Sequence, residues 1–273
     1  MQVKPLSSSS FDAIIDCFLS AFEGYFVPMP QDKAYYQARW AAAKVDFDLS
    51  FGMYDKDMLV GFIVHAIDNR NGRLTAYNTG TGVIPSYRRQ KIVQQIYTHA
   101  IPVLKKNGIT FSTLEVICEN SPALNVYKDV GFNVTRHYKC YKGNILVEPL
   151  SKPELRKLEV EDILEKISDK QIDYSWDFHI NSIRETDFSC YVVLENGEME
   201  SYFIIREENS YLLQFDVLGN SETAWDNLTA GIRSITDTLK VNNIDTRFAE
   251  KMRCIEKLGV KYVVDQYEME MHF

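Results

Sequence analysis

A basic turn between a predicted strand and a predicted helix, in residues 79–93 (TGTGVIPSYRRQKIV), is suited to bind a phosphate. Pro85 has no N–H for strand pairing, so a strand should end there and a helix should follow. The N–H groups in the first turn of a helix are free and carry partial positive charge, which favours anions. Arg88, Arg89 and Lys91 add full charges beside that turn. The alternative interpretation is an ordinary solvated basic turn at the surface.

A second strand-to-helix junction lies downstream. Asn120 follows a predicted buried strand, Tyr127 lies seven residues further along, and Gly131 ends the helix. Together the two junctions resemble the GNAT N-acetyltransferase family, and the resemblance extends over roughly residues 5–142.

Three segments account for this resemblance. Residues 82–88 are similar to the family's fourth strand with its V-x-P-x-Y-R sequence, and residues 88–93 stand where the family has Q/R-x-x-G-x-G/A. Residues 120–132 match the pattern N-x-x-A-x-x-x-Y-x-x-x-G-F. The second pattern, at the right distance from the first, makes the pair far more specific than either alone.

The resemblance implies an α/β (α+β) fold, with a mixed, mostly antiparallel sheet flanked by helices. It implies that acetyl-coenzyme A, or another acyl-coenzyme A, is the co-substrate, with the pantetheine arm between the fourth and fifth strands. Tyr127 would protonate the leaving thiolate, since a phenol of pKa about 10 is a suitable acid for it. The implied coenzyme A contacts are Gly82, Val83, Ile84, Arg88, Arg89, Gln90, Lys91, Ile92, Val93, Gln94, Asn120 and Tyr127.

Lys91 and Val93 depart from the pattern, because they stand where the family has two small residues. Glycine lets a backbone approach a phosphate closely, and the Lys91 side chain is in the way. Its ammonium can pair with a phosphate or point to solvent, and the substitution can also weaken cofactor affinity. The sequence also assigns no general base, since a chain of water molecules would remove the proton of the amine as well as a side chain does. The candidates are Tyr77, Asn78 and Thr79, which are poor bases, and Glu115, Glu119, His65, His99 and His137.

An aromatic and apolar loop follows the first predicted helix, and it includes Phe22, Tyr25 and Met29. In the GNAT family this loop commonly forms one side of the acceptor site, so these three residues are the predicted substrate contacts. Core packing beneath a loop is the competing explanation.

The first half alternates helices and strands, with a hairpin at residues 49–66 followed by a glycine-containing strand. The glycines Gly80 and Gly82 suit a bulge in that strand. The predicted helices are 11–22, 32–44, 92–107 and 121–130, and the further strands are 73–85, 111–118 and a closing strand, 132–141.

The second half repeats this order, which indicates a duplication. We predict two domains, residues 1–145 and 146–273, the second smaller and GNAT-like. Its turn after the predicted fourth strand has Glu222 and no Arg or Lys, so it should lack the phosphate site. The predicted helices are 153–168, 222–239 and 247–258, and the predicted strands are 190–194, 198–205, 211–218 and 260–271.

Composition narrows the function further. A net charge of −8 argues against a nucleic-acid partner and mildly favours a cationic substrate such as an amine. The five scattered cysteines argue against disulfides and a metal site, and fit a reducing compartment. No segment is long and apolar enough for a membrane span, so we predict a cytoplasmic protein with no membrane partner. The oligomeric state has no signal in the sequence.

These features predict transfer of an acetyl or short acyl group from acyl-coenzyme A to the amine of a small molecule or peptide, by direct attack. A non-catalytic acyl-coenzyme A-binding or regulatory protein is the second hypothesis. A protein-interaction module that kept only the fold is the third.

Overall fold

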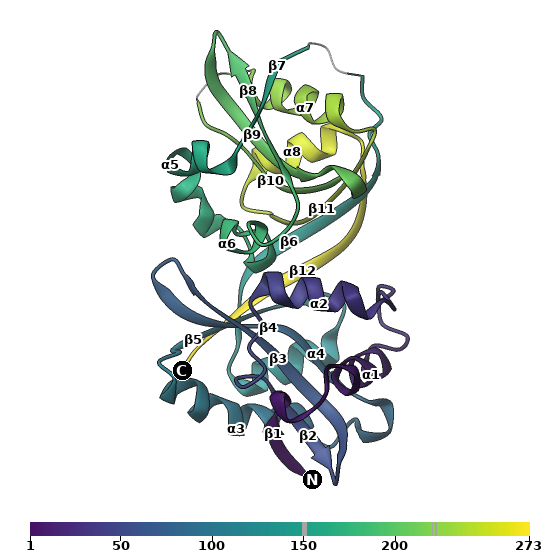
Figure 1. The fold of residues 1–273 in the computed structure, drawn as a ribbon. Coiled ribbons are helices and arrows are strands. Elements are labelled where there is room, and N and C mark those ends of the chain that lie inside the picture. Colours follow the sequence, from purple (N-terminus) through teal and green to yellow (C-terminus); the bar gives the residue numbers. More distant parts are fainter. Residues whose placement is uncertain (149–151, 220, 222) are drawn as a thin grey trace. The chain divides into compact units, whose positions relative to one another are not determined.

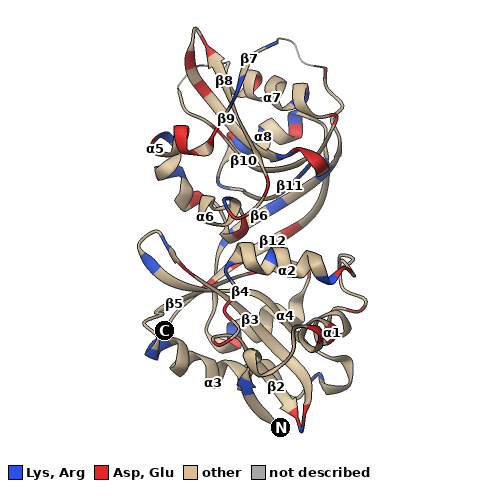
Figure 2. Ribbon diagram, viewed as in Figure 1, with Lys and Arg blue, Asp and Glu red and all other residues tan. Residues whose placement is uncertain are grey.

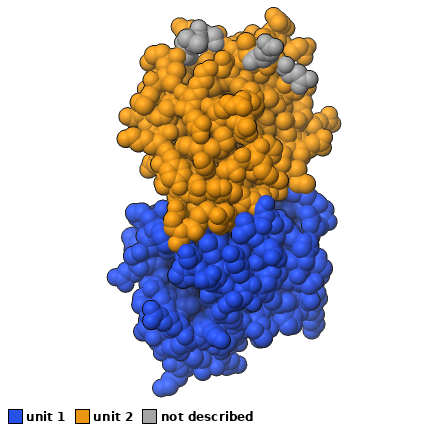
Figure 3. All heavy atoms as spheres, turned by 180° about the vertical axis from the view of Figure 1, so that it is seen from behind, with its two compact units in different colours: residues 1–116, 120–135, 268–273 blue, residues 117–119, 136–267 orange. Residues whose placement is uncertain are grey.

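The computed structural model describes residues 1–148, 152–219, 221 and 223–273 (Figure 1). The chain forms two compact units. Unit 1 contains residues 1–116, 120–135 and 268–273, and unit 2 contains residues 117–119 and 136–267 (Figure 3). Acidic and basic residues are interspersed along both units (Figure 2).

Unit 1 is a twisted sheet with helices, in the strand order β1-β2-β3-β4-β5-β12. Its pairs are antiparallel from β1 to β4, whereas β4 and β5 run parallel. The elements are β1 (Gln2–Pro5), α1 (Phe11–Ala21), α2 (Lys33–Ala43), β2 (Phe51–Asp55), β3 (Met58–Arg70), β4 (Arg73–Val83), α3 (Ile92–Lys106), β5 (Phe111–Ile117) and α4 (Ser121–Val130).

Helix α1 lies very close to β4 in unit 1. The Ser10 side chain caps α1 by accepting from the backbone N–H of Ala13, at 3.2 Å. The ring of Phe18 stacks on Phe62 of β3 with centroids 5.4 Å apart. A Cβ added at Gly82 would lie only 2.7 Å from the Cβ of Ala21, so this glycine is required by the close approach of the helix.

Unit 2 has the strand order β12-β6-β11-β10-β9-β8-β7. Its core is apolar on both faces of the sheet. The strands are β6 (Asn133–Asn144), β7 (Glu154–Leu158), β8 (Ser189–Glu195), β9 (Glu198–Arg206), β10 (Tyr211–Val217), β11 (Thr238–Asp245) and β12 (Lys261–His272). The helices are α5 (Leu164–Ile167), α6 (Ile180–Ile183), α7 (Ala224–Ile235) and α8 (Ala249–Lys257).

The element order of the first half returns in the second. The series β2-β3-β4-α3-β5-α4-β6 corresponds to β8-β9-β10-α7-β11-α8-β12. In both series the third and fourth strands are parallel to each other. The repeat that the sequence predicts is therefore present in the fold.

The closing strands differ from the prediction. Most of β6, which the sequence assigns to the first half, pairs with β11 in unit 2. The end of β12, residues 268–273, belongs instead to unit 1, where the backbone N–H of Phe273 donates to the Thr110 carbonyl at 3.0 Å. A single cut after residue 145 therefore does not separate the two compact units.

Two predicted helices are partly strands. Residues 154–158, expected in a charged helix, form the edge strand β7, which pairs antiparallel with β8. Charged side chains are common on edge strands, because they discourage further pairing, so their helical preference is a weak guide here. The helix expected over 222–239 ends at Ile235, and Leu239 lies in β11, where it is buried.

Candidate functional site

Strands β4 and β5 part from each other after a short parallel pairing. They pair from Thr75 with Phe111 to Asn78 with Leu114, although both strands continue beyond those pairs. The register with β3 shifts between Asn78 and Gly80, so Thr79 is the bulged residue. The bulge is thus at Thr79, and the neighbouring glycines make room for α1.

Beyond Asn78, one edge of β4 is not paired with β5, and its backbone N–H and C=O groups face the space between the two strands. The N–H of Ile84 donates to the Val60 carbonyl of β3, at 3.0 Å. Peptide groups alternate along a strand, so those of Thr81 and Val83 face the opposite edge. A linear chain with amide groups would find hydrogen-bond partners there.

The turn between β4 and α3 has two residues in the left-handed backbone region. Arg89 has φ of 64° and Lys91 has φ of 55°. For a residue with a side chain, this conformation costs about 1–2 kcal/mol. Lys91 thus keeps the backbone conformation that a glycine would adopt at this position.

The N-terminus of α3 is open to an anion. Lys91 is its N-cap residue, with no side-chain capping bond, and the first turn has no acidic residue. Within the described residues, the backbone N–H groups of Arg89, Gln90 and Lys91 donate to no hydrogen-bond acceptor. Free N–H groups and the helix dipole together form an anion site.

The three basic side chains of the turn are exposed, yet they differ in role. The guanidinium of Arg88 donates to the carbonyl oxygens of Val83, at 3.2 Å, and Ala21, at 3.0 Å. Arg89 and Lys91 have no such contact within the described residues. The first-turn residue Ile92 is buried, whereas Val93 and Gln94 are half-buried. Charge for an anion is therefore available from Arg89 and Lys91.

Tyr127 of α4 lies in a buried polar cluster, with 8% of its surface exposed. Burial raises the pKa of its phenol to about 12, and hydrogen bonds from Thr81 and Asn78 oppose that rise. The phenol therefore remains protonated at neutral pH and can donate its proton. Thr81, Asn78 and Tyr97 were not among the residues expected to contact it. The only hints in the sequence are the alternation along β4 and the position of Tyr97 on the buried face of α3.

Asn120 caps helix α4. Its Oδ1 accepts from the backbone N–H of Ala123, at 3.2 Å. The same side chain contacts the phenol of Tyr25, whose pKa is raised by burial and lowered by that contact. The loop after α1 thus reaches the start of α4.

The predicted acceptor residues line one hollow. Phe22 and Tyr25 meet edge to face with centroids 4.9 Å apart, and Met29 lines the same hollow. The hollow is lined by Leu19, Phe22, Glu23, Gly24, Tyr25, Val27, Pro28, Met29 and Gln31. It combines apolar walls with one carboxylate, Glu23, which suits an amine with an apolar body.

None of the histidine candidates has the position of a general base in this cluster. His65 is fully buried, and burial lowers its pKa to about 4, while its Nδ1 lies 2.8 Å from the Leu49 carbonyl. His99 is exposed on α3. His137 lies in unit 2, where its Nε2 is 2.8 Å from Asp265. The base remains unassigned.

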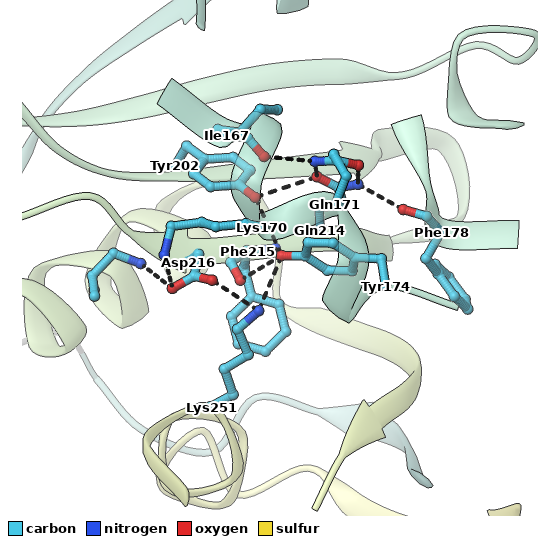
Figure 4. A network of polar contacts seen from close by, with 11 residues as sticks. Ile167, Lys170, Gln171, Tyr174, Phe178, Tyr202, Gln214, Phe215, Asp216 and Lys251 are labelled. Atoms are coloured by element: carbon cyan, nitrogen blue, oxygen red, sulfur yellow. Dashed lines mark hydrogen bonds and ion pairs between the residues drawn. The ribbon is translucent and has the colours of Figure 1, made fainter. Parts of the chain in front are cut away.

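In unit 2 the corresponding strands also part early, since β10 and β11 pair only at Tyr211 with Lys240 and Leu212 with Val241. Side chains fill the space beyond those pairs. The ammonium of Lys251 lies 3.0 Å from Asp216 and donates to the Tyr174 hydroxyl at 3.1 Å (Figure 4). The cavity that remains there is about 20 Å³, enough for one water molecule.

The phosphate site also has no counterpart among the described residues of unit 2. Helix α7 has Asp226 in its first turn, which opposes an anion. Glu222, to which the sequence analysis drew attention, lies outside the described residues. An anion site beside a parted pair of strands is therefore present in the described part of unit 1 and is not repeated in the described part of unit 2.

Unit 1 thus combines a parted pair of strands with a helix N-terminus that is open to an anion, and unit 2 repeats its order of strands and helices. The sequence model of the acetyltransferase (GNAT) family matches residues 11–132. Residues 11–132 therefore match the GNAT family, and the second half repeats the order of their strands and helices. No curated protein matches the sequence.

Solved structures share this architecture over the whole chain. A protein of Pyrococcus horikoshii that has the provisional name of an acetyltransferase aligns over 100% of this chain and 89% of its own, with a TM-score of 0.72 and 12% identity. A GCN5-related N-acetyltransferase from Sphaerobacter thermophilus aligns over 99% and 95%, with a TM-score of 0.68 and 10% identity. A tandem GNAT protein from the clavulanic acid biosynthesis pathway aligns over 99% and 98%, with a TM-score of 0.68 and 13% identity. At these identities the likeness shows the tandem fold.

The described residues contain no group of three or more His, Cys, Asp or Glu side chains arranged to hold a metal ion. They also contain no helix with the length and apolar character needed to cross a bilayer.

Proposed function

We propose that unit 1 transfers an acetyl or short acyl group from acyl-coenzyme A to the amine of a small molecule or peptide. The observation that supports this most directly is the open N-terminus of α3, beside the unpaired edge of β4, in the same unit as a buried and protonated Tyr127. Acetyl-coenzyme A would supply the activated thioester.

Each part of the cofactor has a matching part in this chain. The free N–H groups of Arg89, Gln90 and Lys91 would bind the pyrophosphate, with the Arg89 and Lys91 side chains supplying charge. The backbone groups of Thr81 and the N–H of Val83, on the unpaired edge of β4, would hydrogen-bond the pantetheine amides, and Asn120 is a further expected contact. The remaining predicted contacts belong to the same segment, from the end of β4 to the first turn of α3: Gly82, Ile84, Ile92, Val93 and Gln94.

Tyr127 would hold a proton at its phenol oxygen and donate it to the departing sulfur. A buried neutral phenol is available for this over the whole neutral range, because its pKa is about 12. The acceptor amine would lie against Phe22, Tyr25 and Met29, with Glu23 favouring a cation as it enters. The five free cysteines fit a reducing compartment, and we place the reaction in the cytoplasm.

An amine panel with thiol release as the readout tests this function. Wild-type protein should release thiol from acetyl-coenzyme A with at least one apolar amine. Tyr127→Phe should lower kcat roughly 100-fold. The exposed Tyr35 provides the matched control, since Tyr35→Phe should leave kcat unchanged. Equal rates for wild type and Tyr127→Phe would refute the acid role.

A non-catalytic acyl-coenzyme A-binding protein is the second candidate. It is favoured by Lys91 at a glycine position and by the unassigned base. Calorimetry with acetyl-coenzyme A separates the two, because binding without thiol release for any amine supports the second candidate. No binding at millimolar ligand would exclude both.

A further inference from the structure

The side chain of Gln95, on α3, holds one peptide group of the turn between β4 and α3. Its Nε2 donates to the carbonyl oxygen of Gln90 at 2.9 Å. The backbone N–H of the same residue donates to the Lys91 carbonyl at 3.0 Å. Side chains on a helix lean toward its N-terminus, so a residue of α3 can reach the turn that precedes the helix. Gln95 therefore fixes two successive carbonyl groups of that turn.

The peptide group between Gln90 and Lys91 has its two polar ends on opposite sides. The bond is trans and planar, so its C=O and N–H groups point in opposite directions. Because the Gln90 carbonyl points to the Gln95 side chain, the Lys91 N–H points away from it. No acceptor within the described residues takes this N–H. The bond from Gln95 thus leaves a free donor available to an anion.

This orientation of the peptide group is strained at Lys91, which has φ of 55° and ψ of 30°. A half-turn of the peptide group would change only ψ of Gln90 and φ of Lys91. It would return Lys91 to negative φ and would point the N–H toward Gln95. The strain relieved is comparable in size with one exposed hydrogen bond. The bond from Gln95 is therefore large enough to decide which orientation is favoured.

Other side chains hold the part of the turn that precedes this peptide group. The Tyr87 hydroxyl donates to Asp55 Oδ2 at 2.8 Å, and the guanidinium of Arg88 donates to two backbone carbonyl groups. These bonds do not reach residues 89–91. Within the described part of the chain, Gln95 is the one side chain that hydrogen-bonds to the backbone of residues 89–91.

We propose that Gln95 positions the Lys91 N–H for the pyrophosphate of acyl-coenzyme A, by holding the peptide group between Gln90 and Lys91. This inference rests on the proposed function. Gln95 acts through the backbone and is a positioning residue. With its bond in place, the turn has the binding conformation before the ligand arrives. Without that bond, binding must also reverse the half-turn and restore the strain, so affinity falls.

Gln95→Met tests this assignment in the full chain. Methionine keeps the length and the helical preference of glutamine and removes the donor, and position 95 is exposed, so the variant should fold. The Kd for coenzyme A, measured by calorimetry, should rise about threefold to tenfold. The KM for acetyl-coenzyme A should rise with it, while kcat at saturation should stay within about twofold of wild type.

Thr98→Val is the matched control. The Thr98 hydroxyl also donates to a carbonyl of α3, that of Gln94, at 2.9 Å, but this carbonyl lies outside residues 89–91. The variant loses a bond of the same kind on the same helix and should keep the wild-type Kd. Equal losses of affinity in Gln95→Met and Thr98→Val would overturn the proposal, because any weakening of the first turns of α3 would then suffice.

A double variant shows whether Gln95 acts by opposing the strain at Lys91. In the Lys91→Gly background, Gln95→Met should raise the Kd less than about twofold, because glycine gains little from the half-turn of the peptide group. A loss of affinity as large as in the wild-type background would overturn the proposal.

The Lys91 amide resonance gives a readout that does not depend on turnover. In protein labelled with nitrogen-15 at lysine, Lys91→Arg identifies this resonance. It should move in ligand-free Gln95→Met and stay in place in Thr98→Val. Coenzyme A should shift it downfield in wild type, and less in Gln95→Met, because the N–H then meets a phosphate oxygen less often.

The outcomes separate this proposal from the proposed function. If wild type binds coenzyme A while Gln95→Met keeps the wild-type resonance and Kd, the role of Gln95 is refuted and the proposed function stands. If coenzyme A binds without moving the Lys91 resonance, this N–H is not a phosphate ligand and the proposal is again refuted. If wild type binds no coenzyme A, the proposed function fails and the role of Gln95 falls with it.

Discussion

The guanidinium of Arg88 donates to the Ala21 carbonyl at the end of α1, 3.0 Å away. The arginine that best matches the expected phosphate sequence is therefore engaged in holding the first helix against the turn. Its neighbour Arg89 has no comparable contact within the described residues. Arg88 therefore holds α1 and Arg89 is left for phosphate binding, whereas the sequence had assigned both arginines to the phosphate.

We expect Arg89→Ala to weaken acetyl-coenzyme A binding about fivefold to tenfold at low salt, an effect that should shrink as salt increases. Arg88→Ala should mainly lower the free energy of unfolding, by about 1 kcal/mol, because two carbonyl groups lose their donor. Calorimetry and urea denaturation measure the two effects. Lys106→Ala, exposed at the other end of α3, should change neither. Comparable losses of affinity in both Arg variants, with stability intact, would make Arg88 a phosphate ligand.

Lys91 allows backbone conformation to be separated from charge. Lys91→Ala removes the charge and keeps a side chain at φ of 55°, whereas Lys91→Gly removes both the charge and the strain. The glycine variant should be more stable than the alanine variant by about 1 kcal/mol, and should bind acetyl-coenzyme A more tightly. Lys56, in the β2–β3 turn, also has φ of 55° and serves as the control. Its Gly and Ala variants should differ in stability and agree in affinity.

His65 should make the protein less stable in mild acid. Its pKa is lowered to about 4 by burial, whereas the unfolded chain takes up that proton near pH 6.5. The unfolded state therefore binds more protons between these values, so stability present above pH 6.5 is lost as the pH falls toward 4, by about 3 kcal/mol in all.

Urea denaturation at a series of pH values measures this slope. His65→Gln should flatten it, whatever its effect on stability at pH 7. His99→Gln, at an exposed histidine of α3, should keep the wild-type slope. A His65→Gln protein with the wild-type slope would assign the acid sensitivity to another group.

Lys251 should be important for the stability of unit 2. Lys251→Ala would leave Asp216, whose side chain is 12% exposed, with Lys170 as its remaining cation and would open a cavity. We expect a loss of about 3 kcal/mol in the free energy of unfolding. Lys251→Met, which keeps most of the volume, should cost less. The exposed pair of Lys257 with Asp226 is the control, and Lys257→Ala should cost at most about 0.5 kcal/mol. Equal stability of Lys251→Ala and wild type would contradict the buried pair's role.

The sequence predicted the elements around the site well, because their signals are local. Pro85 ends the pairing of β4, Asn120 caps α4, and Gly131 follows its last turn. The repeated order of elements was readable for the same reason. Each of these features depends on residues within a few positions of one another.

The features that the sequence did not predict depend on residues far apart in the chain. The contact of Arg88 with Ala21 joins positions 67 residues apart, and Asn78 reaches Tyr97 across 19. Residues 154–158 became a strand because β8 was available to pair with them, which no local preference encodes. The exchange of β6 and β12 between units is likewise invisible to periodicity, since the pattern within a strand does not say which strand it pairs with.

That exchange has a consequence for synthesis. Residues 268–273 are part of unit 1, and Phe273 is hydrogen-bonded to Thr110 there. A ribosome that has made residues 1–145 has made every predicted site residue, yet unit 1 still lacks an edge strand. The site-bearing unit would therefore become complete only after residues 268–273 have been made, and a nascent chain would expose the open edge of β5 until then.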